Sequence, residues 1–213
     1  MSKRRIFVVG YGKGYANWME GSIIDDMKKA DLIVLTGGED INPAIYKEQA
    51  HYTTSFNTER DSYEIMMYNK ARDMNKKIIG ICRGAQLVCA LAGGKLIQDQ
   101  GNPFHLHKMH TYDGNELKIT SLHHQAQYPW ILPVDEFKIL AWTNNICKFH
   151  LNGNNEEMNL PDGKECEIVL YPKIDCLGIQ GHPEMMLWNQ KEKFQKTISW
   201  LRNLLNDFMK NKI

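Results

Sequence analysis

Three short apolar runs constrain the fold of this chain more than any other feature of its sequence. They span residues 5–9, 31–35 and 77–81, and each is continuous rather than alternating in polarity. Continuous β-branched runs of this length are typical of strands buried on both faces, as in a parallel sheet. Over residues 59–75, apolar positions recur every three or four residues, which predicts an amphipathic helix. The order of strand, helix and strand therefore predicts an α/β fold.

The rest of the chain adds a second helix, a strand-rich region and a closing helix. Apolar residues continue at helical spacing after residue 82, until Gly93 and Gly94 end that helix. The closing helix carries a single apolar stripe near the C-terminus. Strand-like segments separated by turn-rich stretches are expected at residues 116–120, 137–142, 147–151 and 165–171.

Size, charge and cysteine content narrow the class of protein. The chain has 213 residues, of which 43% are hydrophobic, so it can form one full core, and we expect a single domain over residues 1–213. A net charge of +1 argues against nucleic-acid and membrane-surface partners. The apolar run at residues 6–9 is too short for a secretion signal, and no segment approaches the roughly 18–20 apolar residues of a membrane span. Five scattered cysteines, an odd number, favour a reducing, cytoplasmic compartment: Cys82, Cys89, Cys147, Cys166 and Cys176.

Cys82 stands at the junction between the strand predicted over 77–81 and the helix after it. A cysteine on such a turn has the geometry of a nucleophile elbow, at the edge where open α/β sheets bind ligands. Gly80 and Gly84 flank the turn and allow a sharp bend. The helix N-terminus favours a thiolate, and the N–H of Arg83 can stabilise an oxyanion. We therefore expect Cys82 to be a nucleophile. The alternative is a buried structural cysteine. The other four cysteines lack the flanking glycines, and we interpret them as core or surface residues.

His182 and Glu184 supply the groups that a thiolate nucleophile needs beside it. They lie in the sequence GIQGHPE, residues 178–184, which follows another apolar segment. We expect His182 to take the proton of Cys82 and return it to the leaving amine, while Glu184 holds the imidazole tautomer. His-Pro-Glu alone is more typical of a surface turn, and it gains weight from the cysteine upstream.

A pair of glycines follows the second predicted strand, in the sequence LTGGEDINPAIY of residues 35–46. Glycines let backbone N–H groups approach a bound carbonyl closely. Gly38 is therefore our candidate for a second oxyanion donor, although a Gly-Gly pair by itself is also common at a plain strand-ending turn.

With these elements in order, the sequence resembles the class I glutamine amidotransferase superfamily. Within it, the chain looks most like the γ-glutamyl hydrolase branch, which includes the γ-glutamyl-γ-aminobutyrate hydrolases. The similarity covers roughly residues 31–184 and rests on residues 35–46, 60–100, 121–127 (SLHHQAQ) and 178–184. We accordingly expect a flavodoxin-like three-layer αβα sandwich, with a largely parallel central sheet and an additional small antiparallel β element.

The resemblance implies a Cys-His-Glu triad of Cys82, His182 and Glu184, with oxyanion donors at the N–H groups of Gly38 and Arg83. It implies no cofactor and no metal ion. It also implies contacts to the γ-glutamyl substrate from five further residues: Gly37, Gln86, His123, His124 and Gln125.

The implied reaction is cysteine-dependent cleavage of a γ-glutamyl amide, through a γ-glutamyl thioester, to L-glutamate and an amine. The alternative is a glutaminase subunit that supplies ammonia to a synthetase partner. The R-D-x-x-E pattern of residues 60–64 and the strip 123–125 favour the free-standing hydrolase, for which a homodimer is one expectation. A binding module without catalysis is disfavoured by the complete triad.

Two departures from the family pattern concern the leaving group. Gly181 stands where relatives usually carry a bulky aromatic residue, which suggests extra space beside the triad. The sequence HLHKMH brings together His105, His107, His110 and Lys108. One interpretation is a subsite for a phosphorylated leaving group, such as a nucleotide phosphoramidate released in capsule synthesis. The others are a zinc site without clean ligand spacing, and a solvated loop.

Overall fold

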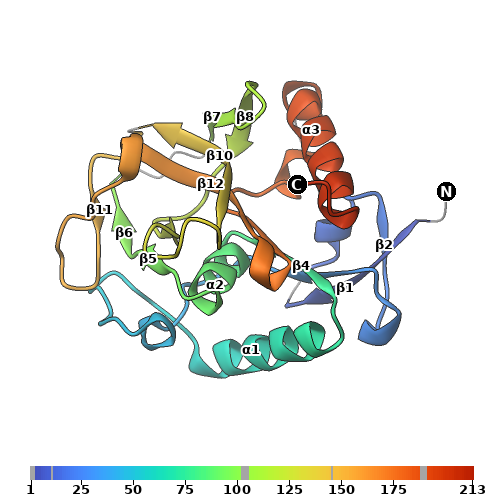
Figure 1. The fold of residues 1–213 in the computed structure, drawn as a ribbon, viewed down its shortest axis with the longest axis horizontal. Coiled ribbons are helices and arrows are strands. Elements are labelled where there is room, and N and C mark those ends of the chain that lie inside the picture. Colours follow the sequence, from blue (N-terminus) through green and yellow to red (C-terminus); the bar gives the residue numbers. More distant parts are fainter. Residues whose placement is uncertain (1–2, 11, 102–105, 145, 188–190) are drawn as a thin grey trace.

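A nine-stranded mixed sheet organises the part of the chain that the computed structural model describes, which is every residue except 1–2, 11, 102–105, 145 and 188–190 (Figure 1). The strand order is β2-β1-β3-β4-β13-β12-β10-β7-β8. In chain order these strands are β1 (Arg4–Val9), β2 (Gly21–Ile23), β3 (Leu32–Leu35), β4 (Lys77–Ile81), β7 (Leu106–Thr111), β8 (Glu116–Thr120), β10 (Lys138–Asn144), β12 (Lys164–Tyr171) and β13 (Cys176–Ile179).

One half of this sheet is parallel and the other is antiparallel. Strands β2, β1, β3, β4 and β13 pair in parallel. From β13 onward, β12, β10, β7 and β8 pair antiparallel. The three runs that the sequence marks as buried parallel strands become β1, β3 and β4, side by side. The residues that follow β3, β4 and β13 therefore meet at one edge of the sheet.

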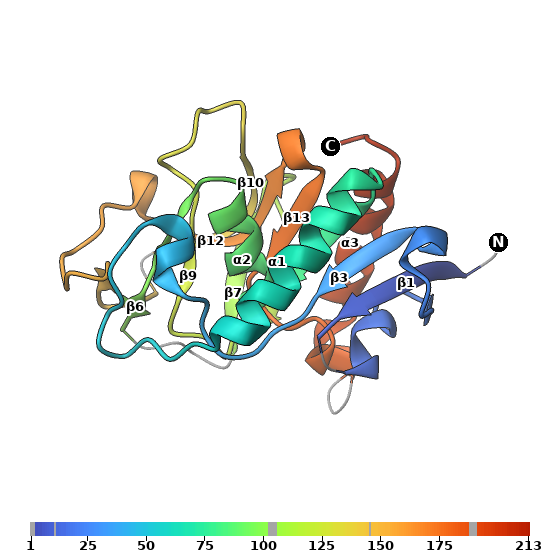
Figure 2. The same ribbon diagram turned by 90° about the horizontal axis from the view of Figure 1, so that it is seen from below.

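Helices cover both faces of the sheet and give the three-layer arrangement (Figures 1 and 2). Alternate residues of β3 point to opposite faces: Leu32 and Val34 join the apolar cluster beneath α3 (Lys191–Met209), and Ile33 and Leu35 join the cluster beneath α1 (Thr58–Asp73) and α2 (Arg83–Leu91). Because both faces are covered, the strand is apolar at every position. The predicted αβα sandwich is confirmed.

Smaller elements complete the described structure. Two-stranded antiparallel pairs join β5 (Lys95–Ile97) to β9 (Ala126–Tyr128), and β6 (Asp99–Gln100) to β11 (His150–Leu151). The strand predicted over 147–151 is therefore reduced to two residues. No helix in the described ranges is long and apolar enough to span a bilayer. Short 3₁₀ helices occur at η1 (Lys13–Ala16), η2 (Met27–Lys29), η3 (Pro43–Tyr46), η4 (Pro161–Gly163), η5 (Pro172–Ile174) and η6 (Met185–Leu187).

Gly84 sets how closely α2 approaches the sheet. A Cβ on this residue would overlap the backbone carbonyl of Leu35 on β3. We therefore expect Gly84→Ala to lower the free energy of unfolding by about 1–3 kcal/mol, because the clash involves backbone atoms that cannot rotate away. Chemical denaturation measures the change. Met66→Ala, at an exposed position on α1, is the control and should stay within about 0.5 kcal/mol of the parent. Equal stability of the two variants would contradict the packing described here.

Candidate active site

Cys82 occupies a sharp bend between β4 and α2. The strand ends at Ile81 and the helix begins at Arg83, as the sequence predicts. Cys82 has φ 51° and ψ −108°, a conformation that costs energy for a residue with a side chain and that recurs at functional turns. Gly80 and Gly84 make the bend possible, since a Cβ on Gly80 would collide with the backbone of Gly84. The bend places the thiol at the N-terminus of α2, beside its first free N–H groups.

His182 and Glu184 meet Cys82 from the end of β13. The Nδ1 of His182 lies 2.7 Å from a carboxylate oxygen of Glu184, and the imidazole also shares a hydrogen bond with the Cys82 side chain. The backbone N–H of His182 donates to the carbonyl of Thr120 at 3.1 Å, which fixes the turn. The structure thus brings together the three residues predicted to form the triad.

Burial and charge act in opposite directions on His182. Burial disfavours its protonated form, but hydrogen bonds and charge interactions with Cys82 and Glu184 outweigh burial and raise its pKa to about 10. The ring is therefore an imidazolium at neutral pH, hydrogen-bonded to the sulfur of Cys82 and to the Glu184 side chain. Such a pair holds a reactive sulfur and a proton donor side by side.

The thiol is more shielded than the sequence suggested. Cys82 is 3% exposed and His182 is 8% exposed. A Cβ on Gly37 would lie 3.1 Å from Cε1 of His182 and 3.6 Å from Cβ of Cys82, so a side chain at this position would crowd the pair. Tyr15, which the sequence analysis missed, approaches the same point: the N–H of Gly37 donates to its hydroxyl oxygen at 3.1 Å. Burial and the charge of Glu184 raise the pKa of Tyr15 to about 12, so its O–H stays protonated beside the triad.

Gly38 and Arg83 are the predicted oxyanion donors. No hydrogen bond within the described residues uses the N–H of Gly38, and the N–H of Arg83 lies in the first turn of α2, where helices have no internal acceptor. Gly37 differs, because its N–H is already bound to Tyr15. The N–H groups of Gly38 and Arg83 are thus free to donate to an oxyanion, whereas that of Gly37 is not.

The side chain of Arg83 forms a buried ion-pair network with α1. Its guanidinium lies 2.5 Å from Oδ1 of Asp61 and also pairs with Glu64. Glu64 accepts a further bond from Arg60 at 2.9 Å, and Arg60 donates to the carbonyl of Gly37 at 2.8 Å. The R-D-x-x-E pattern of residues 60–64 therefore connects the turn after the nucleophile to the glycine pair.

Three of the predicted substrate-binding residues, Gln86, His123 and Gln125, are buried and hydrogen-bonded to one another. The side-chain amide of Gln86 donates to the backbone carbonyl of Gln125 at 2.9 Å, and Nδ1 of His123 lies 2.9 Å from the same oxygen. Burial, followed by charge interactions with His107 and His182, lowers the pKa of His123 to about 3. His123 is therefore a neutral imidazole, which can supply a hydrogen bond but no positive charge.

His124 pairs with two carboxylates. Its two ring nitrogens lie 3.2 Å from Asp40 and 3.3 Å from Asp99. The hydrogen bond with Asp40, helped by Asp99, raises the pKa of His124 despite its partial burial. His124 thus binds carboxylates, whereas His123 binds the backbone carbonyl of Gln125.

The described residues do not show the two features on which the expected leaving-group subsite rested, which are open space at Gly181 and a histidine-rich loop. A Cβ on Gly181 would overlap the Ile119 side chain and approach the carbonyl of Thr120, so β8 fills the space that the glycine suggested. The HLHKMH segment is strand β7 rather than a loop over its described part. Because side chains alternate along a strand, His107 and His110 lie on opposite faces. Nε2 of His107 lies 2.6 Å from Oε1 of Glu167, and His110 is exposed. His105 lies outside the described residues.

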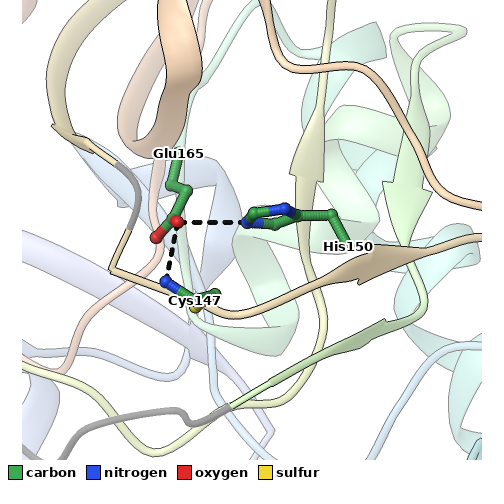
Figure 3. Close-up of side chains that lie close together, drawn as sticks. All are labelled: Cys147, His150 and Glu165. Carbon is green, nitrogen blue, oxygen red and sulfur yellow. Dashed lines mark hydrogen bonds and ion pairs between the residues drawn. The ribbon is translucent and has the colours of Figure 1, made fainter.

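A second cysteine-histidine-glutamate group, Cys147, His150 and Glu165, lies elsewhere in the chain (Figure 3). All three side chains are buried, and their donor atoms lie within 4.8 Å of one another. Cys147 follows β10 and precedes no helix, so it lacks the free N–H groups that surround Cys82. The group therefore lacks the geometry of a nucleophile elbow.

Comparison with known sequences identifies the family of this chain. The sequence model of the Peptidase C26 family matches residues 19–127. Protein NtpR of Enterococcus hirae is 40% identical over 70 residues, which are 32% of this chain and 29% of that protein. A glutamine amidotransferase-like protein of Lactococcus lactis subsp. cremoris, the YvdE homolog, is 43% identical over 70 residues, 32% of this chain and 37% of that protein. The matched stretch thus spans only about a third of these relatives.

Solved structures with the same fold cover the whole chain. A glutamine amidotransferase from Thermotoga maritima aligns over 98% of this chain and 99% of its own, with a TM-score of 0.63 and 12% identity. PurLQS from the same organism aligns over 96% and 99%, with a TM-score of 0.64 and 18% identity. At this identity the likeness establishes the glutamine amidotransferase class I fold.

The imidazolium of His182 depends on its sulfur partner, which gives a direct prediction. Cys82→Ala removes the hydrogen bond that is the largest influence raising the pKa of His182, so this pKa should fall from about 10 by more than about one unit. Titration of the histidine ring resonances by NMR from about pH 5 to about pH 11 measures it. Cys89→Ala, a buried cysteine on α2, is the control. A His182 that titrates near 6.5 in the parent chain would contradict the pairing.

Proposed function

The chain belongs to the Peptidase C26 family, and we propose that it is a cysteine-dependent hydrolase that cleaves γ-glutamyl amides to L-glutamate and an amine. One observation carries the proposal: Cys82, at a strained strand-to-helix bend, hydrogen-bonds to an imidazole that Glu184 holds at 2.7 Å. A nucleophile, a proton carrier and an orienting carboxylate in this order are the requirements of acyl transfer through a covalent intermediate.

The first half of the proposed reaction forms a thioester. The thiolate of Cys82 attacks the γ-carbonyl carbon, and the carbonyl oxygen becomes an oxyanion that the N–H groups of Arg83 and Gly38 stabilise. When this intermediate collapses, the C–N bond breaks and the imidazolium of His182 donates its proton to the leaving nitrogen. The products of this half are a free amine and a γ-glutamyl thioester on Cys82.

The second half releases glutamate. A water molecule replaces the amine, His182 accepts one of its protons, and the hydroxide oxygen attacks the thioester carbon through the same oxyanion site. The C–S bond breaks, glutamate leaves, and the thiolate and imidazolium are restored. Glu184 keeps Nδ1 of His182 protonated throughout, so that the other ring nitrogen faces the sulfur.

The roles assigned to the triad predict different costs for its members. Cys82→Ala should abolish turnover, His182→Ala should lower kcat by about 10²–10⁴-fold, and Glu184→Gln should cost less because it affects orientation rather than proton transfer. Steady-state kinetics on a γ-glutamyl amide, with Cys89→Ala as the control, tests this ranking. Retained turnover in Cys82→Ala, or a larger loss in Glu184→Gln than in His182→Ala, would contradict the roles.

A glutaminase subunit that supplies ammonia to a synthetase is the second candidate, because relatives of this chain are described as glutamine amidotransferase-like. The two functions differ in what the isolated chain does. We expect the purified chain to release glutamate from γ-glutamyl amines at rates at least about 10-fold above that from glutamine, since a hydrolase needs no partner to complete its site.

A mass-spectrometric screen of γ-glutamyl conjugates, with neutral and phosphorylated amines side by side, measures both glutamate and amine release. Cys82→Ala at equal concentration corrects for spontaneous cleavage. Slow turnover of glutamine alone, accelerated by a synthetase, would favour the glutaminase instead.

A further inference from the structure

The buried group of Cys147, His150 and Glu165 is separate from the triad and has no part in the reaction proposed above. Cys147 lies in the connection from β10 to β11, His150 is the first residue of β11, and Glu165 reaches them from β12 (Figure 3). Nε2 of His150 lies 3.0 Å from Oε1 of Glu165, and the backbone N–H of Cys147 donates to the same oxygen at 2.9 Å. A sulfur, an imidazole nitrogen and a carboxylate oxygen thus converge within 4.8 Å.

The buried glutamates around this group pair with histidines rather than with permanent cations. Glu165 and Glu167, alternate residues of β12, are 4% and 3% exposed. Within the described part of the chain, their ion pairs are with His150 and His107, and neither contacts a lysine or arginine. Buried carboxylates without a compensating cation are costly. This corner of the fold is therefore electrostatically suited to a bound cation.

A small enclosed cavity adjoins the group. Cys147, Glu165 and Glu167 line it together with Gln100 and His123, and its volume of about 10 Å³ is room for about one water molecule. Three acceptor atoms of residues on this wall have no hydrogen-bond partner among the described residues: Oε2 of Glu167, Oε1 of Gln100 and Nε2 of His123. Unpaired buried acceptors around one cavity are a second, independent sign of a bound group that donates hydrogen bonds or carries positive charge.

We propose that Cys147, His150 and Glu165 bind one divalent transition-metal ion of the zinc class. The combination of a thiolate, an imidazole and a carboxylate is a ligand set that zinc accepts, whereas magnesium and calcium prefer oxygen alone. The thiolate and the carboxylate together balance the charge of a divalent ion. Three protein ligands leave a fourth position, which the cavity can fill with water.

Metal binding requires a defined proton balance. The thiol of Cys147 loses its proton to solvent as the S–metal bond forms. Nε2 of His150 must present its lone pair to the metal, so its proton resides on Nδ1, which faces Oε1 of Glu157 at 3.7 Å. A carboxylate on the far nitrogen of a metal-binding histidine is the usual second-shell arrangement. The metal would tie residues 147–150 to β12 and stabilise that connection.

Calorimetric titration of the full chain with Zn²⁺ tests the proposal, in a Cys82→Ala background so that the thiol and imidazole of the triad do not compete. We expect one equivalent to bind with release of about one proton near neutral pH, seen by repeating the titration in buffers of different ionisation enthalpy. Adding Cys147→Ala, His150→Gln or Glu165→Gln should weaken binding by at least about 10-fold. Adding Cys89→Ala, a matched buried cysteine, should leave binding unchanged.

Cobalt supplies a readout that does not depend on the variants folding. The Co²⁺ complex of the Cys82→Ala chain, with all three ligands intact, should show the sulfur-to-metal charge-transfer absorption of a thiolate ligand, and adding Cys147→Ala should abolish it. No saturable Zn²⁺ binding, no such absorption, or absorption that persists in a folded Cys147→Ala variant would each overturn the proposal.

Discussion

The ion pairs of Arg83 with Asp61 and Glu64 are the constraint on which the candidate active site depends. Arg83 follows the nucleophile directly, and its side chain is fully buried. A buried guanidinium that loses one carboxylate partner costs about 3–5 kcal/mol, so α1 is held firmly against the turn at Cys82. Arg60, one residue before Asp61, binds the carbonyl of Gly37. One helix therefore holds both the turn after the nucleophile and the glycine pair after β3.

This arrangement explains how a strained residue persists at the bend. The positive φ of Cys82 costs of order 1–3 kcal/mol unless the surroundings enforce it. Here the N–H of Cys82 is bound to Ile179 at 2.8 Å on the strand side, and Arg83 is bound to α1 on the helix side. The sulfur of Cys82 is consequently held beside His182, and Gly37 and the Tyr15 hydroxyl lie close by. Shielding from water strengthens the interaction between this sulfur and the imidazolium.

The sequence predicted the parts of this structure that depend on local patterns. Continuous apolar runs identified β1, β3 and β4, and the strand-to-helix junction identified Cys82 as a bend residue. His182 and Glu184 could be placed because they follow another buried strand, and parallel strands end at one edge. The predicted substrate contacts at residues 123–125 came from family resemblance rather than from spacing. In the structure His124 pairs with Asp40 and Asp99.

What could not be predicted depends on contacts between distant segments. Gly181 suggested open space, but Ile119 on β8 fills it. Strand β7 was missed because a run of histidines and a lysine lacks β-branched residues. Tyr15 comes from the short helix η1, which has no motif of its own. The sequence left open whether Cys147 lies in the core or at the surface. It is buried, and its proximity to Glu165 depends on the antiparallel pairing of β10 and β12.

In the proposed reaction the sulfur of Cys82, and not that of Cys147, carries the glutamyl group. The most direct measurement is acid quenching of the chain during turnover of a γ-glutamyl amide, followed by peptide mapping by mass spectrometry. We expect an added glutamyl group on the peptide that contains Cys82, and none on the peptide that contains Cys147. A glutamyl group on Cys147, or on neither peptide while product accumulates, would contradict it.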